Sequence, residues 1–180
     1  MIGRKVIIIG EIGTGKSSLT LRLIRQAIEL SKLEEITVID MAPSASTLQA
    51  RRIGQRLDEM SDLVKQVVYL APTGITAPRL TARSSEDLVQ RVSRNKQLID
   101  WAIRKYKEKP TPILFINDLS IYLQSGDISS ILELINLAKT FIVNGYYGKS
   151  LDYDLDTGIS KLERRMMDRL IQSVDFVINL

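Results

Sequence analysis

Short runs of apolar residues alternate along the chain with longer segments in which apolar positions recur every three or four residues. The short runs are typical of strands buried on both faces, and they lie at residues 6–9, 36–39, 67–70, 113–116, 141–143 and 176–178. The longer segments have helical spacing and lie at residues 16–30, 44–62, 84–107, 128–139 and 160–173. This alternation predicts an α/β fold with three α/β/α layers around a mostly parallel central sheet.

The spacing of apolar residues also predicts which side chains face the core. In the helix expected over 44–62, these are Leu48, Ile53 and Leu57. In the helix expected over 84–107, they are Leu88, Val92, Ile99, Ile103 and Tyr106. Residues 73–83 contain Thr, Gly, Pro and two Arg without periodicity, which predicts a surface loop.

The composition narrows the class of protein. The 180 residues are 44% hydrophobic and 26% charged, so the chain is typical of a globular protein, and we expect a single domain over residues 1–180. The formal net charge of +4 is spread along the chain, so nucleic acid remains open as a partner but is not indicated by charge. Without Cys or His, disulfides, thiolate zinc sites and histidine-dependent triads are excluded.

No apolar run approaches the ~18 residues that a membrane span needs, so the sequence predicts no membrane insertion. The apolar run near the N-terminus has four residues and is too short for a signal peptide. We therefore expect a cytoplasmic enzyme or binding protein.

The sequence from Gly10 to Ser17, GEIGTGKS, matches the phosphate-binding pattern GxxxxGK[ST] between a predicted strand and a predicted helix. Glycines allow the backbone to curl so that successive N–H groups face one anion, and the helix adds its positive N-terminal end. Lys16 would neutralise the β- and γ-phosphates, and the hydroxyl of Ser17 would bind Mg²⁺. The predicted nucleotide-binding residues are Gly10, Ile12, Gly13, Thr14, Gly15, Lys16, Ser17 and Ser18.

Asp118 follows the apolar run Ile113–Ile116 at the carboxyl end of a predicted strand. Ligands of parallel α/β sheets bind at that edge, so this carboxylate can hold Mg²⁺ opposite Ser17. An ordinary turn-capping role is the alternative. The neighbouring Asn117 could orient a water molecule or simply form part of the turn.

These motifs and the order of the elements resemble P-loop NTPases, and most closely the RecA-like ATPases of the KaiC/RadA-type branch. The resemblance implies ATP and Mg²⁺ as ligands. It also implies a catalytic acid after the second strand, where this chain has Asp40 in place of the family's Glu. A polar sensor of the γ-phosphate is implied after the fifth strand, where Asn144 stands. Assembly into a homo-oligomer, which is common in this family, remains open.

Three functions remain in view. The first is an Mg²⁺-dependent ATPase in which Lys16 neutralises the phosphates, Asp40 polarises the attacking water and Asn144 senses the γ-phosphate. The second is a small-molecule or nucleotide kinase, with arginines closing over the phosphates; the candidates are Arg79, Arg83 and Arg164. The third is a nucleotide-switched interaction module that does not hydrolyse ATP, because Asp40 is one methylene shorter than Glu.

Four weaker signals leave alternatives open. Residues 152–163 resemble an EF-hand calcium loop with a displaced glycine, or form a solvated acidic loop. Arg164, Arg165 and Arg169 form a solvated helix face or reach a neighbouring subunit's phosphates. Tyr146 and Tyr147 stack on a base or fill space within the fold. Glu11 would repel phosphates, so we expect it to point outward or to meet an arginine of a partner.

Overall fold

The computed structural model describes residues 2–44, 46–48, 51–53 and 55–180. Within this part of the chain, six parallel strands form one sheet in the order β5-β2-β6-β7-β1-β8. Their bounds are β1 (Lys5–Gly10), β2 (Ile36–Asp40), β5 (Val68–Leu70), β6 (Ile113–Asn117), β7 (Thr140–Tyr146) and β8 (Phe176–Asn179). The predicted parallel sheet is confirmed.

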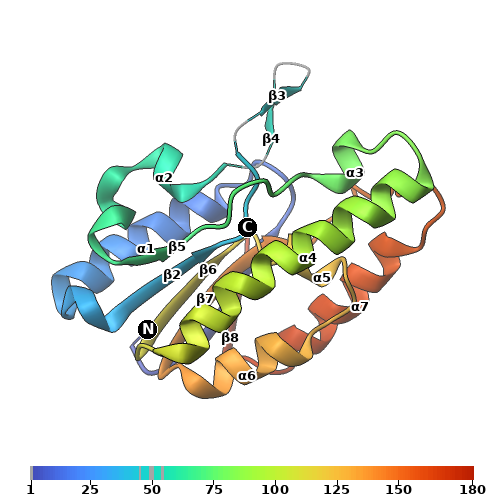
Figure 1. The fold of residues 1–180 in the computed structure, drawn as a ribbon. Coiled ribbons are helices and arrows are strands. Elements are labelled where there is room, and N and C mark those ends of the chain that lie inside the picture. The colour runs from blue at the N-terminus through green and yellow to red at the C-terminus, as the bar shows by residue number, and fades with distance from the viewer. Residues whose placement is uncertain (1, 45, 49–50, 54) are drawn as a thin grey trace.

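Helices cover both faces of this sheet, which gives the expected three layers (Figure 1). One face carries α1 (Lys16–Leu30), α2 (Leu57–Met60) and the 3₁₀ turn η2 (Asp62–Gln66). The other carries α4 (Ser85–Glu108), α5 (Ser120–Leu123), α6 (Ser129–Leu137) and α7 (Ile159–Ile171). The remaining short elements are the 3₁₀ turn η1 (Leu33–Glu35) and the helix α3 (Pro78–Thr81).

The strands separate two apolar cores because successive side chains point to opposite faces. In β1, Ile8 packs into the core that contains Ile24 of α1, whereas Ile7 packs into the core that contains Ile99 of α4. The five inward positions expected for the helix over 84–107 are all buried in α4. The hydroxyl of Ser84 caps this helix by accepting the N–H of Asp87 at 3.2 Å.

The helix expected over 44–62 is wrong. A two-stranded antiparallel hairpin of β3 (Ser46–Leu48) and β4 (Arg51–Ile53) precedes the short helix α2 and extends from the end of the sheet (Figure 1). Of the inward positions expected there, Leu57 is buried, and the side chains of Leu48 and Ile53 lie outside the described residues.

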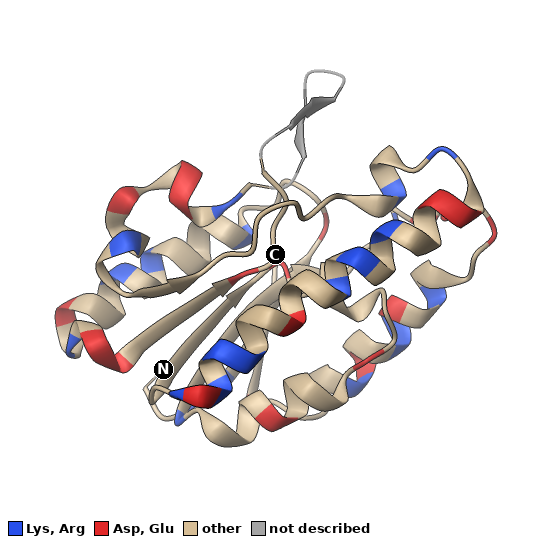
Figure 2. Cartoon of the chain, viewed as in Figure 1, with Lys and Arg blue, Asp and Glu red and all other residues tan. Residues whose placement is uncertain are grey.

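Charged side chains of both signs lie on the helices and loops, while the strands of the sheet carry few of them (Figure 2). Within the described residues, no helix is both long and apolar enough to cross a bilayer. The carboxyl ends of β1, β2, β6 and β7 meet at one edge of the sheet, where Asp40 pairs with Asn117 and Gly10 with Tyr146. The predicted polar residues therefore converge on one edge.

Candidate functional site

The loop between β1 and α1 folds around two glycines in the left-handed region. Gly13 has a φ of 77° and Gly15 a φ of 91°, which residues with a Cβ rarely adopt. Helix α1 then begins at Lys16 with no side-chain cap and no acidic residue in its first turn. Its first N–H groups and its positive dipole end are therefore available to an anion.

The side chain of Lys16 folds back over this loop. Its ammonium donates to the backbone carbonyl oxygens of Gly10, at 3.0 Å, and of Glu11. Burial lowers the pKa of Lys16, while the negative charges of Asp118 and Glu11 oppose this shift. Within the described part of the chain, the ammonium donates to neutral oxygens, so a phosphate would be a stronger partner.

A cavity of about 290 Å³ lies beside the loop, at the carboxyl edge of the sheet. Six of the eight predicted nucleotide-binding residues line it: Ile12, Gly13, Gly15, Lys16, Ser17 and Ser18. Gly10 and Thr14 do not line it. Gly10 accepts the Lys16 ammonium, and the hydroxyl of Thr14 donates to the carbonyl oxygen of Glu11 at 3.0 Å. Asp118 and Asn144 line the same cavity, which brings most of the predicted site together.

Asn117 lies at the centre of a buried hydrogen-bond network. Its side-chain carbonyl oxygen accepts the hydroxyl of Ser17 at 3.1 Å and the amide of Asn144 at 2.8 Å. Its own amide donates to Asp40 at 2.8 Å. The direct cross-sheet partner of Ser17 is therefore a neutral amide, and Asn117 is more than a turn residue.

Asp118 occupies the turn that leaves β6, with a φ of 57°. Its backbone N–H donates to Asn144 at 3.0 Å, and its carboxylate accepts the hydroxyl of Ser120 at 2.6 Å. Burial raises the pKa of Asp118, and the positive charges of Lys16 and Arg79 act against this shift. A cation in the cavity would favour the ionised carboxylate in the same way.

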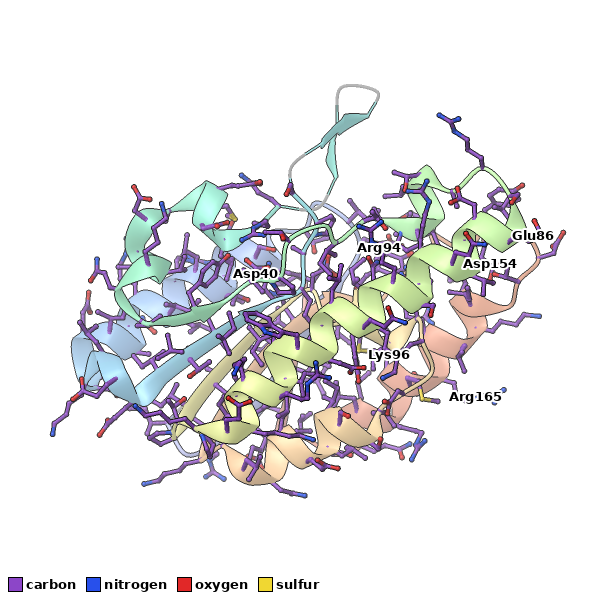
Figure 3. All side chains as sticks on the ribbon, viewed as in Figure 1. Asp40, Glu86, Arg94, Lys96, Asp154 and Arg165 are labelled. Atoms are coloured by element: carbon purple, nitrogen blue, oxygen red, sulfur yellow. The ribbon has the colours of Figure 1, made fainter. Side chains whose placement is uncertain are left out.

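Asp40 lies inside the fold at the end of β2 and does not line the cavity (Figure 3). Four donors reach its two oxygens, and the side chain has 0% exposure. The donors are the N–H groups of Ala42 and Leu57, the hydroxyl of Tyr69 and the amide of Asn117, at 2.7–3.1 Å. Burial raises the pKa of Asp40 and these four hydrogen bonds oppose the rise. In this arrangement Asp40 reaches the cavity lining through Ala42 and, by way of Asn117, through Ser17 and Asn144.

Asn144 lines the cavity, but its side chain is committed to neighbours. The amide donates to Thr20 of α1 at 2.7 Å and to Asn117 at 2.8 Å, and the carbonyl oxygen accepts the N–H of Asp118. Asn144 thus joins α1, β6 and β7. Its role as a sensor of the γ-phosphate stays a prediction.

Glu11 points away from the curl of the loop and clasps the segment after β7. Its carboxylate accepts the backbone N–H groups of Lys149 and Ser150 and the hydroxyl of Ser150. The hydroxyl of Ser150 and the N–H of Lys149 lower the pKa of Glu11. A Cβ at Gly148 would lie 2.2 Å from the Glu11 carboxyl carbon, so any larger residue there would displace the Glu11 carboxylate from its present position. The contact lies within the chain and needs no partner arginine.

Arg79 is buried, although it lies in a segment predicted as a surface loop. Its Nη2 atom lies 2.8 Å from Oε2 of Glu163, and its Nη1 donates to the carbonyl oxygen of Leu151 at 3.0 Å. The guanidinium also packs over the ring of Tyr146, with its carbon 5.2 Å from the centroid. Both Arg79 and Tyr146 line the cavity. Burial raises the pKa of Glu163 to about 7, and Arg79 opposes that rise.

The other weak signals lie outside the cavity. Arg164 stacks on Tyr147, with its guanidinium carbon 3.8 Å from the ring centroid, and donates to Gly148. Arg83, Arg165 and Arg169 are exposed, and Arg165 points outward from α7 (Figure 3).

In the acidic segment at 152–163, Asp154 accepts the N–H of Ser160 at 2.8 Å near the start of α7. Glu163 turns into the fold toward Arg79. Within the described part of the chain, no group of three or more acidic, His or Cys side chains is placed to hold a metal ion.

Among the residues of the cavity wall, sequence reasoning did not predict Gln124, the packing of Tyr146 against an arginine, or the burial of the Arg79 side chain. Gln124 follows the short helix α5 and is 3% exposed. No motif marks these positions. For Arg79, the one available signal was the apolar Ile75 in the same segment, because a buried residue there indicates that the segment packs against the fold.

No protein-family model matches the sequence, and no curated protein matches it. Among solved structures, the chain is similar to the crystal structure of Pif1 helicase from Candida albicans, with 16% identity and a TM-score of 0.43. The match covers 99% of this chain and 36% of the helicase chain, so the chain spans about a third of that protein's length.

Proposed function

We propose that this chain is a P-loop NTPase that binds ATP with Mg²⁺ at the cavity and hydrolyses it. One observation carries the proposal: the uncapped start of α1 opens onto the same cavity as Lys16, Ser17 and Asp118. This combination supplies an anion site, a mobile cation and oxygen ligands within one small volume. The choice of adenine rests on the resemblance to RecA-like ATPases.

The residues present fit a triphosphate. Backbone N–H groups over residues 12–17 would hold the phosphates, and Lys16 would exchange its carbonyl partners for phosphate oxygens. Glu11, the one acid within the loop, is held by Lys149 and Ser150 and does not line the cavity. The binding residues thus favour negative charge.

The residues also fit a hard divalent cation. The hydroxyl of Ser17 directs its proton to Asn117 and keeps its lone pairs available, and Asp118 adds a carboxylate on the same cavity. A hydroxyl and one carboxylate are too few ligands for an all-protein site, so we expect Mg²⁺ to arrive with the phosphates. The ion would supply charge neutralisation at the phosphate oxygens.

A second candidate is a protein that binds ATP without turnover. It is favoured by the geometry of Asp40, whose two oxygens already accept four hydrogen bonds. To polarise a water molecule, Asp40 would have to release one of these donors and open toward the cavity. Hydrolysis through Asp40 is therefore expected to be slow.

Two measurements test both candidates. The first is calorimetric titration with ATP, once in the presence of Mg²⁺ and once in EDTA, and the second is a phosphate-release assay without added acceptor. Binding that needs Lys16, together with release of free phosphate, supports the ATPase. Binding without release supports the second candidate. If the wild-type chain binds no nucleotide in the presence of Mg²⁺, both proposals are wrong.

A further inference from the structure

A buried ion pair forms the wall of the cavity away from the phosphate loop. Arg79 belongs to α3 and Glu163 to α7, and their side chains are 5% and 4% exposed. One guanidinium nitrogen of Arg79, Nη2, donates to Oε1 of Glu163 at 3.0 Å and lies 2.8 Å from Oε2. The pair therefore joins segments 84 residues apart.

This pair is not fully satisfied. Within the described residues, three buried side-chain atoms form no hydrogen bond: Nε of Arg79, Oε1 of Gln124, and Oε2 of Glu163, whose approach to Nη2 is an ion-pair contact only. Gln124 acts on the same carboxylate and lowers the pKa of Glu163, so all three atoms belong to one cluster. Unsatisfied buried polar groups are costly, and native proteins keep few of them. Arg79 thus has spare hydrogen-bonding capacity in its present position.

The cluster lies close to the expected phosphate site. Arg79 and Gln124 line the cavity together with Lys16 and Ser17. The positive charge of Arg79 lowers the pKa of Asp118, whose carboxylate belongs to the same cavity. The charged groups that face Glu163 are Arg79 from α3 and Asp118 from the end of β6. A phosphate held between the loop and this wall would compete with Glu163 for the guanidinium.

On the basis of the proposed function, we propose that Arg79 recognises the terminal phosphate of a bound nucleoside triphosphate. The phosphate replaces Glu163 as the hydrogen-bond partner of the guanidinium. A guanidinium binds carboxylate and phosphate through the same planar fork, and the phosphate offers more acceptor oxygens. Gln124 stays beside Glu163, where it continues to favour the ionised carboxylate. Arg79 thereby makes the site selective for triphosphates over diphosphates.

A purely structural ion pair between α3 and α7 has a different signature. Its removal would weaken the binding of ATP and ADP by the same factor, because it would act on the fold and not on one phosphate. The ratio of the two dissociation constants therefore separates the two roles.

The experiment measures the dissociation constants of MgATP and MgADP by calorimetry. Removing Arg79 alone leaves Glu163 buried and unpaired, so the main variant is the double substitution Arg79→Gln/Glu163→Gln. We expect the double variant to bind MgATP about 10- to 100-fold more weakly, because two charge-assisted hydrogen bonds are lost. The affinity for MgADP should change less than about twofold. Glu163→Gln alone is expected to tighten MgATP several-fold, because it frees Arg79 from its competitor. Arg104→Gln on α4, which removes one exposed arginine, is the matched control.

Equal changes for MgATP and MgADP, or no change in either, would overturn the proposal while leaving the proposed function intact. Wild-type protein that binds neither nucleotide would overturn both. If the double variant fails to fold in urea titrations, Arg79→Lys replaces it, since it keeps the charge and loses the fork. A loss of MgATP selectivity in that variant supports the proposal, and retained selectivity contradicts it.

Discussion

The hydroxyl of Ser17, in the first turn of α1, donates a 3.1 Å hydrogen bond to the side-chain carbonyl oxygen of Asn117 at the end of β6. The amide of Asn117 continues the contact to Asp40 at 2.8 Å. The first turn of α1 is thus joined to a buried carboxylate through a neutral side chain.

Asn117→Asp should destabilise the fold. The new carboxylate would replace an amide that now donates to Asp40, and two carboxylates at that separation repel each other. We expect a loss of about 2–4 kcal/mol in the free energy of unfolding at pH 7, partly recovered near pH 5 because the pair can then share a proton. Urea unfolding at both pH values measures this. Asn179→Asp, on an exposed residue of β8, is the control, and an Asn117→Asp chain as stable as wild type at pH 7 would contradict the network.

Lys16→Ala should remove stabilisation by nucleotide. At a ligand concentration of about 100 Kd, binding stabilises the wild-type fold by about 2.7 kcal/mol, which corresponds to a rise of roughly 5–10 °C in Tm. We expect no rise for Lys16→Ala with MgATP, because the ammonium that neutralises the phosphates is gone. Lys149→Ala, an exposed lysine nearby, should retain the full shift. Equal Tm shifts in wild type and Lys16→Ala would rule out this site for ATP.

Asp40→Asn should cost stability as well as turnover. Each carboxylate oxygen of Asp40 accepts two hydrogen bonds, and those of Oδ2 come from the Leu57 N–H and the Tyr69 hydroxyl. An amide nitrogen in place of either oxygen would therefore face two donors. We expect a loss of about 2–4 kcal/mol in unfolding free energy. Phosphate release, measured at a temperature where the variant stays folded, should be lost while MgATP binding remains. Asp62→Asn at an exposed site controls for the removed charge, and retained turnover in Asp40→Asn would exclude Asp40 from hydrolysis.

Glu163 should make the wild-type fold less stable as the pH rises from about 4.5 to 7. Burial raises its pKa from 4.5 to about 7, so over this interval the folded chain keeps a proton that the unfolded chain has lost. The stabilisation is complete below pH 4.5 and is lost as the pH passes 7. The expected loss is on the order of 3 kcal/mol, and it should be missing in Glu163→Gln. Urea unfolding from pH 4.5 to 8 tests this, with the exposed Glu34→Gln as control; identical pH slopes in all three chains would contradict it.

The sequence was sufficient where the physical cause is local. Strands buried on both faces need continuous apolar runs, so β1, β2, β6 and β7 were expected. The apolar runs of β5 and β8 also predicted strands, but these two lie at the edges of the sheet and are partly exposed. A phosphate loop requires glycines at set positions, and α1 begins at Lys16 as predicted. Ser84 also predicted the start of α4 correctly, because its capping hydrogen bond is local and spans three residues.

The sequence was misleading where apolar spacing was sparse or contacts were distant. The positions of Leu48, Ile53 and Leu57 match a helix by chance, with Gly54 between them, and the chain forms β3, β4 and α2 instead. The interpretation of 73–83 as a surface loop failed at Ile75, Pro78 and Arg79, which are buried. The partner of Arg79 lies 84 residues away, and no local pattern records such a pair.

The clasp of Glu11 on Lys149 and Ser150 has a consequence for the entropy of ligand binding. It fastens the phosphate loop to a segment 138 residues further along the chain, so the loop is ordered before any ligand arrives. Ordering a free loop on binding would reduce affinity, because each immobilised residue loses backbone freedom. Here the contacts of Glu11 already order the loop, so the nucleotide that we propose would meet a preorganised site.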